Sequence, residues 1–100
     1  MLDHALEASE MCRGCTRADL DRDRKLNLAL VRLVEVIGEA ANRVTAERRQ
    51  SLPAIPWPEI IGMRNRIVHG YDQVDFDILW AVVQQDLPPL IDQLRGTLQP

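Results

Sequence analysis

Two stretches of this sequence carry apolar residues at the spacing that packs one helix against another. Between residues 19 and 44, and again between residues 76 and 94, the apolar positions advance by 4, 3, 4, 3 and 4 residues, which is the spacing of a seam between packed helices. No segment alternates apolar and polar residues cleanly, as a half-buried strand would. An all-α fold is therefore predicted. The seams consist of Leu26, Leu30, Leu33, Ile37, Ala40 and Val44, and of Phe76, Trp80, Val83, Leu87, Leu90 and Leu94.

Helix boundaries in the first half follow from cap and turn residues. A short helix is predicted over residues 2–13, because Gly14 ends it in the manner of a C-cap. The first seam belongs to a long helix over residues 19–44, for which Thr16 or Asp19 is a suitable N-cap.

A third helix is predicted beyond a proline-rich break. After a short helical turn near residues 45–49, prolines at positions 53, 56 and 58 exclude a continuing helix. Pro58 suits the first position of the next helix. This helix is predicted to run to Val68 or His69 and to stop at Gly70.

The fourth helix is predicted over residues 76–94, with Asp75 as its N-cap. Pro88 and Pro89 lie inside it, and the apolar seam continues through them, which predicts a kink rather than an end. Four helices with short connections predict a single domain over residues 1–100, built as an antiparallel up-and-down four-helix bundle.

Composition excludes several classes of protein. With 46% hydrophobic and 27% charged residues, the chain has the composition of a globular domain. Its longest apolar run is broken by Arg32, Glu35 and Glu39, and it stays below the ~18 residues of a membrane helix. The sequence does not open with a basic stretch followed by an apolar core, so a cytoplasmic protein that does not engage membranes is expected.

The charge is unevenly distributed along the chain. A net charge of −3 argues against a protein that coats nucleic acid with its whole surface. Residues 13–66 nevertheless carry eleven Lys or Arg against seven acidic residues, whereas residues 72–100 carry five Asp against one Arg. This asymmetry fits either a local basic face for a polyanion or ordinary solvated helix faces.

Cys12 and Cys15 have a Cys-x-x-Cys spacing. A zinc site needs two more ligands, and none lies nearby in the sequence. A thioredoxin-type site needs a βαβ unit, which is not predicted. Two ordinary thiols at a helix end are favoured, and neither a metal nor a cofactor is expected.

Gly38 lies inside the predicted long helix, where glycine costs up to ~1 kcal/mol relative to alanine. That cost indicates that another backbone or a ligand packs closely there. Together with Leu28 and Val31, Gly38 outlines a second surface that fits a dimer interface. Glu35 and Glu39 are one helical turn apart and are expected to face solvent.

Residues 63–71 contain the side chains best suited to chemistry. Arg64 offers a cationic fork that fits phosphate, and His69 titrates near neutral pH. On a continuous helix Asn65 and His69 share a face, whereas Arg64 and His69 point ~140° apart. Arg64 and His69 therefore converge only at a distorted helix end or across a symmetric dimer. Tyr71 follows a helix-ending glycine and is expected to expose its hydroxyl. From the residues alone, a surface arginine and a histidine that caps a helix end remain the alternative.

The motifs, taken in order, resemble the HepT-like toxins of the HEPN superfamily. Arg64-x4-His69-x-Tyr71 is similar to the family's Arg-x4-His-x-Tyr motif. Residues 36–41, Val-Ile-Gly-Glu-Ala-Ala, resemble its Ile-Gly-Glu-Ala segment. Residues 55–65 resemble its Pro-Trp element followed by Met-Arg-Asn. The resemblance covers about residues 20 to 95.

The resemblance implies a HEPN-like homodimer whose two Arg-x4-His segments meet at a shared cleft. It implies a metal-independent endoribonuclease that acts as the toxin of a type II toxin–antitoxin pair, with Arg64 and His69 as catalytic residues. Asn65 would orient His69 or a phosphate oxygen. The implied antitoxin is an MNT-type nucleotidyltransferase that attaches AMP to Tyr71.

Two other functions are alternatives. Some HEPN proteins act as non-catalytic nucleotide-binding or scaffolding partners of a nucleotidyltransferase, in which case Arg64 and His69 would bind nucleotide. A purely structural dimerisation bundle is the third possibility, but such a bundle needs none of Arg64, His69 and Tyr71.

Overall fold

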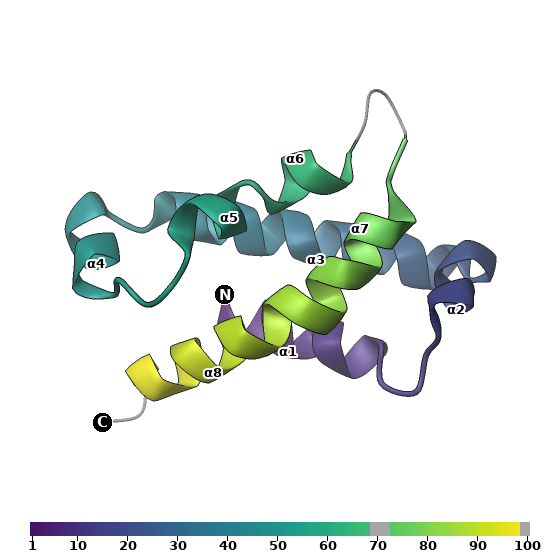
Figure 1. The fold of residues 1–100 in the computed structure, drawn as a ribbon, viewed down its shortest axis with the longest axis horizontal. Helices are drawn as coiled ribbons and strands as arrows, with labels where there is room; N and C mark the ends of the chain where they lie inside the picture. The colour runs from purple at the N-terminus through teal and green to yellow at the C-terminus, as the bar shows by residue number, and fades with distance from the viewer. Residues whose placement is uncertain (69–72, 99–100) are drawn as a thin grey trace.

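The computed structural model describes residues 1–68 and 73–98 (Figure 1). Among the described residues, helices are the regular elements and one isolated antiparallel bridge joins Val68 to Val74, so the predicted all-α class is confirmed. Within them, no helix has both the length and the apolar character needed to cross a membrane. The elements are α1 (Leu2–Met11), α2 (Arg17–Arg22), α3 (Arg24–Arg43), α4 (Ala46–Ser51), α5 (Trp57–Ile61), α6 (Met63–Ile67), α7 (Phe76–Ala81), the π-helical segment η1 (Val82–Asp86) and α8 (Leu87–Leu98).

The long helix α3 is the centre of the fold. Helices α1, α2, α5, α6 and α7 all contact it. In Figure 1, α7 crosses α3, and η1 and α8 continue diagonally over α1. The predicted seam is confirmed over most of its length, although Ala40 and Val44 are only half-buried and Ala41 is fully buried instead. The buried apolar residues of α3 are Leu26, Leu30, Leu33, Val34, Ile37 and Ala41.

The helix predicted over residues 19–44 is wrong at its start, because the structure divides this region into α2 and α3. Asp23 has non-helical backbone angles, φ −101° and ψ 96°, and its Oδ1 accepts the N–H of Leu26 at 3.1 Å. The aspartate therefore begins a new helix instead of continuing the old one. Thr16 caps α2, as one of the two alternatives predicted, and Asp19 completes the capping box three residues later.

The third predicted helix is also divided, into α5 and α6 at Gly62. In a continuous helix the carbonyls of Ile60 and Ile61 would accept hydrogen bonds from the N–H groups four residues on. Both carbonyls instead face α3, where a Cβ added to Gly38 would lie 3.3 and 3.4 Å from their oxygens. The missing side chain of Gly38 thus admits the backbone of another segment, as the sequence predicted.

The last helix continues through Pro88 and Pro89. The π-helical segment η1 lies just before them and changes the hydrogen-bonding pattern from which the prolines are missing. The N–H of Leu87 donates to the carbonyl of Val82, five residues back, and the two prolines that follow have no N–H to donate. A π turn takes an extra residue and shifts the buried face by one position. Leu79 is therefore fully buried, whereas the predicted seam residue Trp80 is only half-buried.

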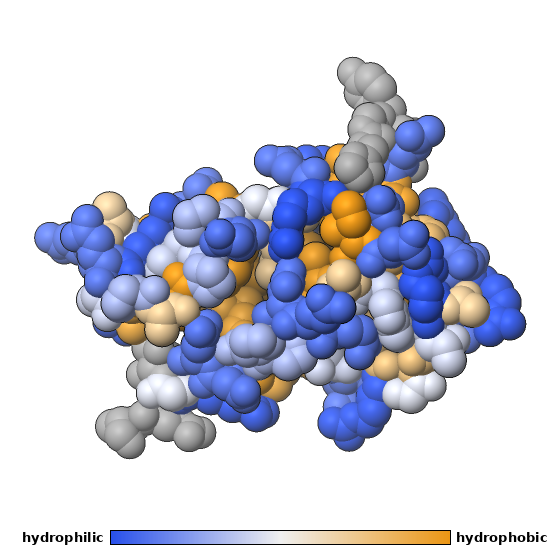
Figure 2. Space-filling view, viewed as in Figure 1, coloured by the Kyte–Doolittle hydropathy of each residue, from blue (hydrophilic) through white to orange (hydrophobic). Residues whose placement is uncertain are grey.

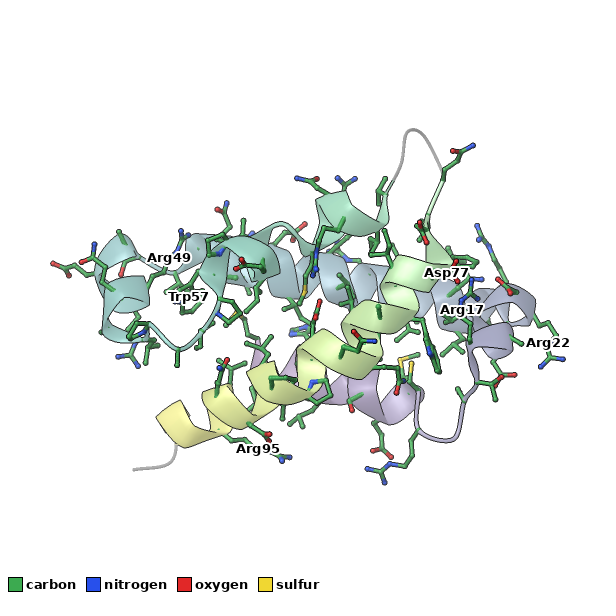
Figure 3. The ribbon with its side chains drawn as sticks, in the orientation of Figure 1. Arg17, Arg22, Arg49, Trp57, Asp77 and Arg95 are labelled. Carbon is green, nitrogen blue, oxygen red and sulfur yellow. The ribbon has the colours of Figure 1, made fainter. Side chains whose placement is uncertain are left out.

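Arg49 and Trp57 fasten the far end of α3 (Figure 3). The Nη2 of Arg49 donates to the carbonyl oxygens of Ala41 and Asn42 at 3.3 and 2.8 Å. The indole N–H of Trp57 donates to the carbonyls of Arg49 and Leu52. Arg49 thus adds a hydrogen-bond donor for carbonyls at the end of α3, and Trp57 joins the start of α5 to α4.

Replacing Gly38 with alanine is expected to destabilise the protein. Alanine improves helix propensity by ~1 kcal/mol, but overpacking in a tight contact costs ~1–3 kcal/mol. The net loss expected for Gly38→Ala is therefore about 1 kcal/mol in the free energy of unfolding, measured by urea denaturation. Gly96 of α8 has open space around its Cβ position, so the control Gly96→Ala should stabilise by ~0.5–1 kcal/mol. Equal stabilisation by both variants would contradict the close contact.

Candidate active site

The Arg-x4-His segment begins on the short helix α6. Met63 and Ile67 are buried in the core, and Arg64, Asn65 and Arg66 are exposed. The two apolar side chains anchor the helix and turn its polar face outward. This face carries two of the residues that the sequence singled out for chemistry.

Helix α6 ends before the histidine of the motif. Val68 has extended backbone angles, φ −103° and ψ 120°, and pairs with Val74. The helix therefore ends at Ile67, one residue before the predicted end at Val68 or His69. The predicted helix face shared by Asn65 and His69 includes His69, which lies outside the described residues. A distorted helix end was one of the two conditions under which arginine and histidine could converge.

His69 and Tyr71, the predicted catalytic histidine and the predicted modified tyrosine, lie outside the residues that the structure describes. The described residues on either side, Val68 and Val74, pair with each other in the isolated bridge. Both of these residues lie between α6 and α7 (Figure 1).

Arg64 is held by a carboxylate on α3. Its Nε lies 3.6 Å from Oε1 of Glu35, and the arginine side chain remains 55% exposed. Oε2 of Glu35 lies 3.4 Å from Nη1 of Arg32. The same Nη1 lies 3.8 Å from Oε1 of Glu39. Glu35 was predicted to face solvent, and this is wrong: its side chain is 23% exposed, against 52% for Glu39.

An open groove of about 190 Å³ lies beside this ion pair. It brings Arg64 and Asn65 together with two carboxylates and the buried Gly38, so a ligand in the groove would meet both a guanidinium and an amide. The lining residues are Glu35, Gly38, Glu39, Asn42, Ile61, Arg64 and Asn65.

A larger groove of about 580 Å³ lies nearer the start of α3. Leu28, which is 52% exposed, lies in this groove with the half-buried Val31 and Phe76. Two residues of the predicted dimer surface, Leu28 and Val31, are thus accessible. The third, Gly38, was wrongly included, because it packs against α5 of its own chain. The groove is lined by Arg24, Asn27, Leu28, Val31, Gln73, Val74, Asp75 and Phe76.

One face of α3 borders both grooves. Its residues 28, 31, 35, 38 and 42 advance by 3, 4, 3 and 4 positions, which places them in a row along the helix. At 1.5 Å per residue, Leu28 lies about 10 Å along the axis from Glu35. The apolar groove and the Arg64 groove are therefore neighbours on one surface.

Ion pairs inside the chain account for part of the charge asymmetry. Arg17 on α2 donates to Asp77 on α7 at 2.8 Å (Figure 3). Arg66 on α6 is 2.8 Å from Asp86 of η1. Two of the C-terminal acidic residues thus hold basic residues of the first two-thirds of the chain. The hydrogen bonds that Arg17 donates to Asp21 and Asp77 raise the pKa of Arg17, so this arginine remains charged.

Cys12 and Cys15 are free thiols. Burial, and to a lesser extent Cys15, raises the pKa of Cys12 to about 11. The Sγ of Cys15 donates to the carbonyl of Met11 at 3.5 Å. Among the described residues, no three His, Cys, Asp or Glu side chains group closely enough to hold a metal ion.

Comparison with known proteins identifies the family. The model of the HepT-like family, described as "Ribonuclease HepT-like", matches residues 1–96. The chain belongs to the HepT-like ribonuclease family. No solved structure matches this member of the family.

Several curated relatives of this HepT-like chain have names that describe RNases. The chain is 34% identical to "Putative RNase TTE0752" of Caldanaerobacter subterraneus subsp. tengcongensis over 98% of its own length and 91% of that protein. It is 36% identical to "Probable ribonuclease HepT" of Thermococcus cleftensis over 89% of its own length and 84% of that protein. It is 29% identical to "Putative RNase MJ1380" of Methanocaldococcus jannaschii, with 90% and 83% covered.

Glu35 is the site residue that sequence analysis missed. The sequence contained a signal for it, since Glu35 lies one turn before Gly38 on the same helix face. The segment that packs on Gly38 leads directly into α6, which carries the partner of Glu35.

Proposed function

We propose that this chain is an RNA endonuclease and the toxin of a type II toxin–antitoxin system. Membership of the HepT-like ribonuclease family supports this proposal. The placement of Arg64 supports the assignment to particular residues. Its side chain is half exposed at the edge of a groove, five residues before His69.

RNA carries a nucleophile of its own, the 2′-hydroxyl next to each phosphate. In the proposed mechanism His69 accepts or donates a proton as general base or acid. Arg64 stabilises the negative charge that develops on the phosphate oxygens. Asn65 contacts a phosphate oxygen from the same exposed face of α6. These steps require no metal ion.

We further propose that two copies of the HEPN-like four-helix bundle form a homodimer. Leu28 and the apolar side chains around it offer a surface beside the Arg64 groove. A two-fold axis near this face would bring a second Arg64 and a second His69 to one cleft, so that acid and base are separate side chains.

The proposed antitoxin is an MNT-type nucleotidyltransferase that transfers AMP from ATP to the hydroxyl of Tyr71. Tyr71 is two residues from His69. The phosphate of the attached AMP would therefore pair with Arg64 in place of the phosphate of the RNA. The added adenosine would fill the cleft.

Arg64→Ala and His69→Ala are each expected to abolish RNA cleavage and growth inhibition. The expected loss is about 10²–10⁴-fold in rate for a positioned acid–base or charge-stabilising group. Cleavage of a labelled oligoribonucleotide measures it, and cleavage by the wild type should persist in EDTA. The control is Arg95→Ala, an exposed arginine on α8 away from α6 (Figure 3), which should remain active. An active Arg64→Ala or His69→Ala enzyme would contradict the assignment.

Leu28→Glu is expected to convert the dimer to a monomer, because it places a charge on the proposed interface. A stable dimer interface usually buries more than ~1,200 Å², so sedimentation velocity at micromolar concentration should separate the two states. Ala54→Glu adds the same charge at an exposed position outside this groove and should remain dimeric. A monomeric wild-type chain would contradict the shared cleft.

Tyr71→Phe is expected to remain toxic and to escape neutralisation, because it keeps the ring and lacks only the acceptor oxygen. Intact mass measured after incubation with the partner transferase and ATP decides this. The wild type should gain one or more AMP masses, and Tyr71→Phe should gain none. Equal modification of both proteins would mean that another side chain accepts AMP.

A further inference from the structure

Glu35 lies between Arg64, which lines the groove, and Arg32 on the same helix. Its Oε1 faces Nε of Arg64 at 3.6 Å, and its Oε2 faces Nη1 of Arg32 at 3.4 Å. With a side chain only 23% exposed, Glu35 is far more restricted than Glu39, which meets only Arg32 in this cluster. Both oxygens of Glu35 are thus engaged by cations from two directions.

The fold fixes the distance between Glu35 and Arg64. Gly38, one turn along α3 from Glu35, touches the carbonyls of Ile60 and Ile61, which lie just before α6. Backbone atoms form this contact, so it has no side-chain rotamers through which to relax. The separation of α3 and α6 is therefore set within reach of an arginine–carboxylate pair.

The ion pair uses one edge of the Arg64 guanidinium. A guanidinium has five N–H donors, and the Nε donor faces Glu35 while the terminal amino groups carry the other four. Among the described residues, Glu35 is the ion-pair partner of Arg64, and it approaches the guanidinium at Nε. The terminal amino groups form the edge that binds two phosphate oxygens at once.

We propose that Glu35 is a positioning residue, which holds the Nε edge of Arg64 so that its terminal amino groups face the phosphate to be cleaved. This inference rests on the proposed ribonuclease function. A carboxylate beside a polyanion weakens its binding by repulsion, so Glu35 has two opposed effects. It opposes RNA binding, and it orients the group that stabilises the transition state.

Glu39 provides the matched control. It is a carboxylate of the same groove, one turn from Glu35, and shares Arg32 with it, but it forms no ion pair with Arg64. Its removal should relieve repulsion without disturbing Arg64. Comparing variants of the two glutamates therefore separates the effect of orienting Arg64 from the effect of removing a negative charge from the groove.

The experiment compares Glu35→Gln with Glu39→Gln in the full chain, using an oligoribonucleotide substrate at fixed salt. Glu35→Gln should lower kcat by about 10–100-fold, as expected for a misplaced charge-stabilising group, while KM stays the same or falls. Glu39→Gln should leave kcat unchanged and lower KM.

The Nε–H signal of Arg64 in ¹⁵N NMR spectra gives a readout that does not depend on cleavage. It should be visible at neutral pH in the wild type and in Glu39→Gln, and lost in Glu35→Gln, where exchange with water becomes fast. Thermal denaturation of the same samples tests whether the signal is lost because the variant unfolds.

Three results would overturn the inference. They are an unchanged kcat for Glu35→Gln, equal effects of the two glutamine variants, or an unchanged Nε–H signal. If instead the wild type cleaves no RNA and the signal is still lost in Glu35→Gln, the proposed ribonuclease function fails while the orientation of Arg64 by Glu35 stands.

Discussion

The contact between Gly38 and the carbonyls of Ile60 and Ile61 is the constraint on which the site depends. A backbone-to-backbone approach of this kind is possible only where one residue lacks a side chain. It divides the third helical region at Gly62, and it draws the start of α6 toward α3. Arg64 reaches Glu35 as a consequence. One glycine on the longest helix thus determines where the candidate catalytic arginine lies.

The surface around this contact combines features that rarely serve packing alone. An arginine that is half exposed next to an open groove has lost part of its hydration, and its carboxylate partner Glu35 is only partly buried. The exposed Leu28 lies on the same face of α3 (about 10 Å away along the axis). Apolar area next to charged groups is typical of surfaces that bind another macromolecule. Figure 2 shows apolar residues reaching the surface where α6 and α7 meet.

The rest of the molecule supports this surface through interactions that are distant in sequence. Arg17 and Asp77 join α2 to α7, and Arg66 and Asp86 join α6 to η1. Exposed pairs of this kind contribute little stability individually. Their effect is to fix the position of short helical segments relative to their neighbours, because each segment buries few side chains of its own. Trp57 does the same at the other end through two hydrogen bonds from its indole.

The amino-acid sequence by itself determined the helical class, the seam of α3, the cap at Asp75 and the close contact at Gly38, because periodicity, capping and glycine cost act locally. It also determined the family, since an ordered set of short motifs can be recognised without knowledge of the packing. The break at Asp23 rests on its cap to Leu26 and on Asn27 donating to the carbonyl of Leu20, both within seven residues, so it was open to sequence reasoning and was hidden by the apolar seam. The end of α6 at Ile67 and the partial burial of Glu35 were decided by tertiary structure, through the pairing of Val68 with Val74 and through Arg64, which is remote from Glu35 in the sequence. Local patterns show which face of a helix is covered, and only the packed chain shows what covers it.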